Sequence, residues 1–328
     1  MVKSRIGAIA RAMLHGWIIL DKPVGLGSTT AVSAVKRILR EAGEPKTKVG
    51  HGGTLDPLAS GVLAIALGEA TKLAGRMLDA TKAYDFVIRF GEETDTLDAE
   101  GLVIATSDVR PMLDDVEAVL PRFTGEISQV PPAYSALKIG GKAAYARARA
   151  GEQVEMKART VIIHALSIRH RREGGDPAQS EKPGSRFRGN DEMALSTTVS
   201  KGTYIRSLAR DIPQALGTVG HVSYLRRTRA GPFGLEQAVS LDFLEELAKA
   251  RALDGAVLPL EAALDDIPAL PVTSRQAELL RHGQRLAGFP AQPGLCMAML
   301  EGTPVALVEA TADGLKVVRG FNLCNEQE

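Results

Sequence analysis

Strand and helix patterns follow one another along this chain without a strict strand–helix–strand alternation, and this order restricts the fold more than any other feature. Apolar or alternating runs typical of strands occupy residues 16–23, 62–67, 82–90, 161–169, 193–200 and 221–228. Helical periodicity is found at 28–39, where Ser28 is the expected N-cap, and at 116–123, 203–212 and 241–251. We therefore expect an α+β fold with a central mixed, largely antiparallel sheet flanked by helices.

The chain of 328 residues is long enough for about two domains. A main domain is expected at 1–257. From about Leu258 the character changes, because Pro259, Pro268 and Pro271 indicate a linker. A short helix at 274–281 and strand-like runs at 297–300, 305–309 and 315–319 then predict a small C-terminal β domain at 258–328.

Two segments of the main domain lack the patterns of a core. Residues 131–160 form a basic stretch rich in small residues, which we interpret as an excursion from the core. Residues 171–192 are polar and rich in Gly and Pro, and they join two strand-like runs. This second segment is expected to be a disordered hairpin tip.

Charge and cysteine content exclude several classes of protein. The formal net charge is only +1, which excludes a histone-like polycation, but residues 1–50 and 201–230 carry an excess of basic residues. These basic blocks could bind a polyphosphate backbone, or they could be ordinary solvated surfaces. No run is apolar enough for a membrane helix or a signal peptide, and Cys296 and Cys324 are not spaced as a metal site. We expect a cytoplasmic protein with no bound metal.

Several residues are candidates for chemistry. Asp56 lies in the glycine-rich segment 49–58, where a carboxylate is free to act as a nucleophile or base. The basic turn 200–206 opens a helix, and its Arg206 could pair with such a carboxylate. Each feature alone also has an ordinary structural explanation. Asp56 could form a simple Asp-Pro turn, segment 200–206 a capped surface helix, and Tyr84 and Leu225 parts of the core.

Taken together, the motifs are far more specific. The ordered motifs lie at residues 19–23, 50–61, 68–72, 82–84, 94–101, 132–138, 200–206 and 224–227. Over about residues 16–239 the chain resembles the TruB family of tRNA pseudouridine synthases. Gly52 departs from the family pattern, which often has a threonine after the histidine. Segment 171–192 looks like an insertion, and the C-terminal stretch resembles a PUA-like RNA-binding domain only loosely.

The resemblance implies a pseudouridine synthase fold and isomerisation of uridine 55, in the T-loop of tRNA, to pseudouridine without cofactor or metal. Asp56 is then the nucleophile at the ribose, and Arg206 is its ion-pair partner. Tyr84 stacks on the extruded uracil or removes a ribose proton, so that direct attack at C1′ and an elimination route both stay open.

The resemblance also implies the residues that bind the RNA. Tyr204 and Leu225 line the pocket, His51 fills the gap left by the flipped base, and Lys22 supports the loop of Asp56. The segment at about 131–160 closes over the RNA, and the basic blocks hold the stem. The expected phosphate contacts of the closing segment are Lys138, Lys142, Arg147 and Arg149.

Two alternative functions remain open from the sequence. The chain could be an RNA-binding folding helper that opens the tRNA elbow, although such a protein would not need Asp56, Arg206 and Tyr84 together. It could also be a guide-RNA-dependent synthase, but the long closing segment and the weak terminal domain argue against this. We therefore expect the T-arm of tRNA as the partner, with no guide RNA and no obligatory protein partner.

Overall fold

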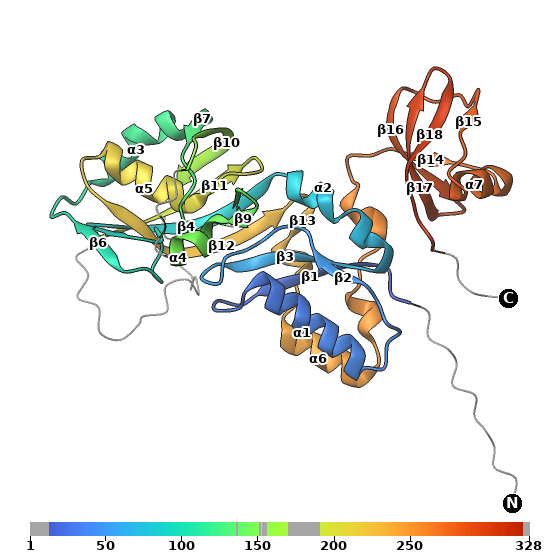
Figure 1. The fold of residues 1–328 in the computed structure, drawn as a ribbon, viewed down its shortest axis with the longest axis horizontal. Helices are drawn as coiled ribbons and strands as arrows, with labels where there is room; N and C mark the ends of the chain where they lie inside the picture. The colour runs from blue at the N-terminus through green and yellow to red at the C-terminus, as the bar shows by residue number, and fades with distance from the viewer. Residues whose placement is uncertain (1–12, 136, 151, 153–155, 170–190, 324–328) are drawn as a thin grey trace, which may run out of the picture.

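The computed structural model describes residues 13–135, 137–150, 152, 156–169 and 191–323. Its centre is a nine-stranded sheet with the order β1-β3-β12-β4-β11-β10-β7, to which β2 is added on β3 and β13 on β12 (Figure 1). Within this sheet β3 and β12 run parallel, and the other pairs in the described residues run antiparallel. The expected mixed, largely antiparallel sheet is confirmed. The strands are β1 (Gly16–Lys22), β2 (Val49–His51), β3 (Ser60–Leu67), β4 (Lys82–Phe90), β7 (Gly125–Gln129), β10 (Arg159–Ile168), β11 (Glu192–Val199), β12 (Gly220–Ala230) and β13 (Phe233–Gly234).

Helices cover the sheet at both ends (Figure 1). Side chains of α1 and α6 share one hydrophobic cluster with β1 and β3, which includes Val35, Leu63 and Leu244. Side chains of α3 and α5 form another cluster with β4, which includes Val116, Phe86 and Leu208. The α-helices of this domain are α1 (Ser28–Glu41), α2 (Ala74–Asp79), α3 (Leu113–Val119), α4 (Ala144–Arg149), α5 (Ile205–Ala215) and α6 (Leu241–Ala250). The 3₁₀ helices are Gly68–Lys72, Leu120–Phe123, Leu235–Gln237, Leu253–Ala256 and Leu260–Ala263.

The start of α1 differs from the sequence-based expectation. The N-cap is Gly27, and Ser28 is the first helical residue without a side-chain capping bond. The Ser28 hydroxyl group instead exchanges two 2.8 Å hydrogen bonds with the backbone N–H and carbonyl of Leu55. The serine therefore ties the helix to a distant loop, because a buried hydroxyl group takes the partners that the tertiary structure offers.

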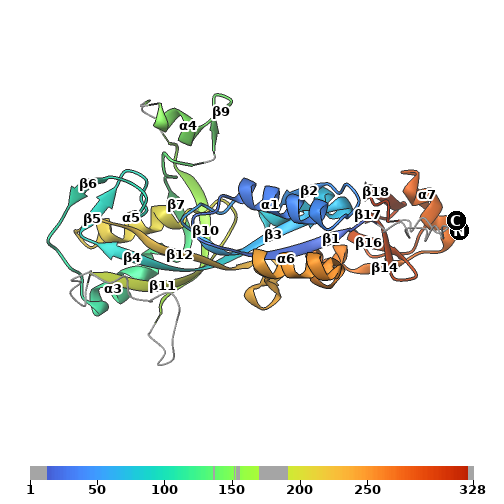
Figure 2. The ribbon, with the colours of Figure 1, turned by 90° about the horizontal axis from the view of Figure 1, so that it is seen from below.

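The segment at about 131–160 leaves the sheet after β7 and returns at β10. It contains β8 (Lys138–Ile139), β9 (Lys142–Ala143) and α4, which project from the body of the domain (Figure 2). A separate hairpin, β5 (Glu92–Thr94) with β6 (Val103–Thr106), lies at one end of the sheet. The strands β10 and β11 pair antiparallel as expected. Residues 170–190 between them lie outside the described residues, so the disordered tip stays a prediction.

The C-terminal part forms a second sheet with the order β14-β16-β17-β18-β15. Its elements are β14 (Ala269–Pro271), α7 (Ser274–Arg281), β15 (Leu286–Ala287), β16 (Gly294–Leu300), β17 (Thr303–Thr311) and β18 (Gly314–Gly320). This part has its own hydrophobic core, so the expected small β domain is present. Residues before it, including Leu258 and Leu260, hydrogen-bond to Trp17 of β1 and so belong spatially to the main sheet. No helix in the described ranges is long and apolar enough to cross a membrane.

Candidate active site

The loop between β2 and β3 carries Asp56 and is fixed by side chains from three different elements. Ser28 of α1 binds both backbone groups of Leu55. The buried ammonium group of Lys22, at the end of β1, contacts the Pro57 carbonyl at 3.4 Å. Arg227 of β12 donates to the Thr54 carbonyl at 3.2 Å. An irregular backbone held in this way presents a carboxylate at a defined position, which catalysis requires.

Gly52, the departure from the family pattern, has a steric explanation. A Cβ atom placed on Gly52 would lie 2.5 Å from the Cβ atom of Met77 in α2. Such an approach is far inside van der Waals contact. This chain therefore needs glycine after His51, because α2 packs directly against the loop.

Arg206 and Asp56, two of the expected catalytic residues, form an ion pair. The Nη2 atom of Arg206 lies 2.8 Å from Oδ2 of Asp56, so the ion pair expected from the sequence is present. The same guanidinium group donates to the backbone carbonyls of Thr96 at 2.9 Å and Tyr134 at 3.0 Å. Arg206 is buried in the first turn of α5, whereas the Asp56 side chain is 38% exposed. Asp56 is therefore oriented by Arg206 and still accessible to a substrate.

The sequence-based site missed a second carboxylate. Asp98, which follows β5, lies 3.2 Å from Nη1 of Arg206 and is buried. Its other oxygen accepts hydrogen bonds from the Thr96 hydroxyl at 2.6 Å and the Glu100 N–H at 3.1 Å. The recurring acids of motif 94–101 were the available signal. Nothing in that motif showed which acid turns toward Arg206.

The apolar part of the expected site is assembled from four elements. Tyr84 of β4 and Leu225 of β12 belong to the same hydrophobic cluster as Leu55 and Ile205, the neighbours of the two charged residues. Tyr84 is half-buried. Leu225 is nearly fully buried. Tyr84 and Leu225 thus belong to the same core as the residues that flank Asp56 and Arg206, and their contact with a substrate stays a prediction.

Tyr204 is held by a residue that the sequence did not single out. The buried Gln129 side chain binds the Tyr204 backbone twice, accepting from its N–H at 2.8 Å and donating to its carbonyl at 3.1 Å. The Arg159 guanidinium group stacks on the Tyr204 ring, 4.8 Å from its centre. Both contacts fix the turn that precedes Arg206.

Burial in the core of the site shifts the pKa of both Lys22 and His51. Burial lowers the pKa of the Lys22 ammonium group to about 8, although the Asp56 carboxylate acts in the opposite direction. Burial and the nearby Arg227 guanidinium group also lower the pKa of the His51 imidazole. His51 is therefore neutral near pH 7.

We expect the Lys22 amine to titrate near pH 8 in the folded protein, well below a free lysine. Replacing Asp56 by Asn should lower this midpoint further, because the carboxylate stabilises the charged ammonium group. NMR of ¹⁵N- or ¹³C-labelled lysine measures both values. A free lysine measured under the same conditions is the reference. A Lys22 midpoint equal to that of free lysine would contradict this description of the loop.

The expectation that the 201–230 basic block grips RNA is wrong for two of its members. Arg206 and Arg227 are buried, so they serve the interior of the site. Arg226 pairs with Asp21 and Lys201 with Asp79, each at 2.8–2.9 Å. Burial therefore removes Arg206 and Arg227 from the surface, whereas RNA binding by the remaining members of the block stays a prediction.

The expected phosphate contacts of segment 131–160 can be described only in part. Arg147 of α4 pairs with Glu152 at 2.6 Å. The side chains of Lys138, Lys142 and Arg149 lie outside the described residues. Their role in binding RNA stays a prediction.

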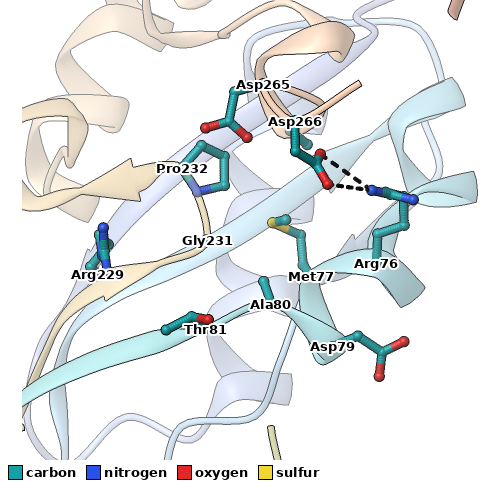
Figure 3. A pocket seen from close by; sticks show the side chains of 11 residues that line it. Arg76, Met77, Asp79, Ala80, Thr81, Arg229, Gly231, Pro232, Asp265 and Asp266 are labelled. Carbon is teal, nitrogen blue, oxygen red and sulfur yellow. Dashed lines mark hydrogen bonds and ion pairs between the residues drawn. The ribbon is translucent and has the colours of Figure 1, made fainter. Parts of the chain in front are cut away.

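A pocket of about 540 Å³ lies apart from these residues (Figure 3). It lies among α2, the turn after β12 and the segment that precedes the C-terminal domain, and the Arg76–Asp266 ion pair crosses one side of it. None of the expected site residues lines it. The candidate active site is thus defined by the Asp56–Arg206 pair and its surroundings rather than by this cavity.

Comparison with known proteins identifies the family of the chain. Residues 36–205 match the family model "TruB family pseudouridylate synthase (N terminal domain)", and residues 206–265 match "tRNA pseudouridylate synthase B C-terminal domain". A protein of Novosphingobium aromaticivorans named tRNA pseudouridine synthase B is 58% identical over 312 residues, which cover 95% of this chain and 98% of that protein. A protein of Zymomonas mobilis with the same name is also 58% identical, over 94% of this chain and 96% of that protein.

Solved structures show the same architecture. A chain of an H/ACA RNP bound to a substrate RNA containing 2′-deoxyuridine superimposes with a TM-score of 0.67 at 25% identity. The match covers 94% of this chain and 85% of that chain. A chain of a Cbf5-Nop10-Gar1 complex superimposes with a TM-score of 0.66 at 27% identity, over 94% of this chain and 84% of that chain.

The family models and the named relatives define the class of this protein as a pseudouridine synthase, which is an isomerase, and the α+β fold is consistent with this class. The chain belongs to the TruB family of pseudouridylate synthases, as its ordered motifs predicted.

Proposed function

We propose that this tRNA pseudouridine synthase isomerises uridine 55 in the T-loop, with Asp56 as the nucleophile and no cofactor. The observation that carries this proposal is the ion pair between Arg206 and an accessible Asp56. Arg206 is held by Asp98 and two backbone carbonyls as well, so it orients Asp56 independently of the substrate. Such preorganisation is the usual source of catalytic power at charged sites.

The reaction needs a carboxylate for a specific reason. The bond between C1′ and N1 of uracil breaks, and a bond between C1′ and C5 forms. N1 gains a proton and C5 loses one, so the product has the same composition as the substrate. Positive charge develops at C1′ while the base is detached, and the Asp56 carboxylate stabilises or captures that charge. The apolar neighbours Leu55 and Leu225 keep water away from the ribose.

The base must leave the helical stack before it reaches Asp56. We infer that Tyr84 stacks on the extruded uracil, an interaction worth about 1–3 kcal/mol. His51, which is neutral and half-buried at the end of β2, fills the space that the base leaves. This replacement offsets an unstacking cost of about a few kcal/mol. Tyr204 and Leu225 line the remaining walls of the pocket.

The projecting segment of β8, β9 and α4 is the proposed RNA-closing element (Figure 2). Its root contacts α5 directly, because Ser207 donates to the Val130 carbonyl at 2.8 Å and Arg206 to the Tyr134 carbonyl at 3.0 Å. The same helix thus holds the root of the closing segment and the partner of the nucleophile. We infer that the chain binds the T-arm through this element, without guide RNA or protein partner.

An isolated T-arm hairpin should be a sufficient substrate, because one flipped base and one stem-loop account for all the RNA-binding elements proposed here. Purified protein is incubated with a transcript of the hairpin and with full-length tRNA, and pseudouridine is mapped in both. We expect modification at position 55 only, with kcat/KM values for the two RNAs within about tenfold.

A hairpin with cytidine at position 55 is the matched negative control. A strict requirement for full-length tRNA would contradict the proposed binding mode. Modification at another uridine would contradict the proposed target. Efficient opening of tRNA without any pseudouridine would favour the alternative of an RNA-folding helper.

A further inference from the structure

Arg227 is a buried arginine whose donors are directed at backbone. It lies on β12 and is only 2% exposed. Nε donates to the Val62 carbonyl at 2.7 Å, and Nη1 donates to the Thr54 carbonyl at 3.2 Å. Nη2 lies 3.5 Å from the Gly53 carbonyl. Two of these three carbonyls belong to the loop that carries Asp56.

This guanidinium group has no acidic partner among the residues that the structure describes. The neighbouring arginines differ, since Arg206 pairs with Asp56 and Asp98, and Arg226 pairs with Asp21. A buried cation without a counter-charge is costly to the folded state, and carbonyl dipoles compensate only part of the cost. An apolar residue would avoid this cost, so the stability of the core alone does not explain an arginine at this position.

The surroundings of Arg227 connect it to both ends of the loop. Gly61, the second residue of β3, has a φ of +98°, and a Cβ atom there would collide with the Arg227 carbonyl. The start of β3 is therefore pressed against the backbone of Arg227 while the guanidinium group holds the Thr54 carbonyl. At the other end, the positive charge lowers the pKa of His51. Arg227 therefore contacts the backbone of the loop between His51 and Asp56, and its charge also acts on the His51 imidazole.

We propose that Arg227 is a positioning residue for pseudouridine formation, which fixes the His51–Asp56 loop through the Gly53 and Thr54 carbonyls. This inference rests on the proposed function, since it assigns meaning to the position of His51 and Asp56. It requires that the rate of the chemical step depend on Arg227 although Arg227 does not touch the reacting atoms.

Two variants separate geometry from charge. In Arg227→Met the carbonyls lose their donors and the charge disappears. In Arg227→Lys the charge stays, but an ammonium group cannot reproduce the planar fork that reaches several carbonyls. The matched control is Arg122→Met, since Arg122 is exposed in the 3₁₀ helix Leu120–Phe123 and lies outside the basic blocks.

Single-turnover rates at saturating enzyme and Kd values for the T-arm hairpin are measured for all variants, together with Tm. We expect Arg227→Met to lower the single-turnover rate by about 100-fold or more while Kd rises at most about tenfold. Arg227→Lys should recover part of the rate, and Arg122→Met should stay within about threefold of the parent. A rate of Arg227→Met within about threefold of the parent would overturn the proposal.

The imidazole titration of His51, followed by NMR in the free protein, gives a second readout. Loss of the cation should raise the His51 pKa in Arg227→Met, whereas Arg122→Met should leave it unchanged. An unchanged His51 pKa in Arg227→Met overturns the electrostatic part. If Arg227→Met does not fold, Arg227→Lys decides, and a parental rate in that variant overturns the proposal. Failure of the parent to modify the hairpin refutes the proposed substrate, whereas the His51 titration still tests Arg227.

Discussion

Replacing Asp56 by Asn should abolish pseudouridine formation and leave binding of the RNA nearly intact. The amide cannot capture positive charge at C1′ as a carboxylate does, and it loses the charge-assisted contact with Arg206. We expect the rate to fall by at least about 10⁴-fold, while Kd changes by less than about tenfold. Tritium release from C5-labelled uridine in tRNA measures turnover, and filter binding measures Kd.

Asp85→Asn is the matched control for this experiment. Asp85 is also a partly buried carboxylate paired with an arginine, since Oδ2 lies 2.9 Å from Nη1 of Arg169. It follows Tyr84 on β4 and therefore points to the opposite face of the sheet. The control should turn over at close to the parental rate. If Asp56→Asn turned over as fast as Asp85→Asn, Asp56 would not be the nucleophile.

Arg206→Lys should be the second most damaging change. The guanidinium group of Arg206 reaches two carboxylates and two carbonyls at once, namely Asp56, Asp98, Thr96 and Tyr134. A lysine keeps the charge, but its single ammonium group cannot reach all four of the acceptors that the planar guanidinium group contacts. Asp56 would then lose its orientation, and Asp98 would be left as a buried, unpaired carboxylate. We expect the single-turnover rate to fall by about 10³-fold, with a lower Tm.

Arg210→Lys, one turn further along α5, is the control for this variant. Arg210 also donates to a backbone carbonyl, that of Val130, and contacts the adjacent Asp211. It has no contact with Asp56, so its replacement should change the rate by less than about threefold. Adding Asp98→Asn to Arg206→Lys should restore part of the Tm, because it removes the unpaired buried charge. Equal rates for Arg206→Lys and Arg210→Lys would refute the role of Arg206.

The relation between sequence and structure is clearest for the core elements. Strand β4 lies where alternating hydrophobicity predicted it, because a strand with one buried face buries every second side chain. Strand β3 lies where a continuous apolar run predicted a buried strand, and it is buried along its whole length. Helix α7 also lies at the predicted residues. The α+β class followed from the order of those elements. The N-cap of α1 was misassigned to Ser28. Its hydroxyl group has a better partner in Leu55, which is far away in the sequence.

The motifs by themselves determined the family, the fold class and the expected pairing of Asp56 with Arg206. Only the tertiary structure decided that Asp98 shares Arg206, that Gln129 holds Tyr204, and that Arg227 is buried without an acidic partner. It also decided that α2 leaves no room for a side chain at Gly52. The physical reason is that periodicity and motif spacing describe local preferences. Which acid meets a buried arginine, and which helix approaches a loop, depends on how distant segments pack.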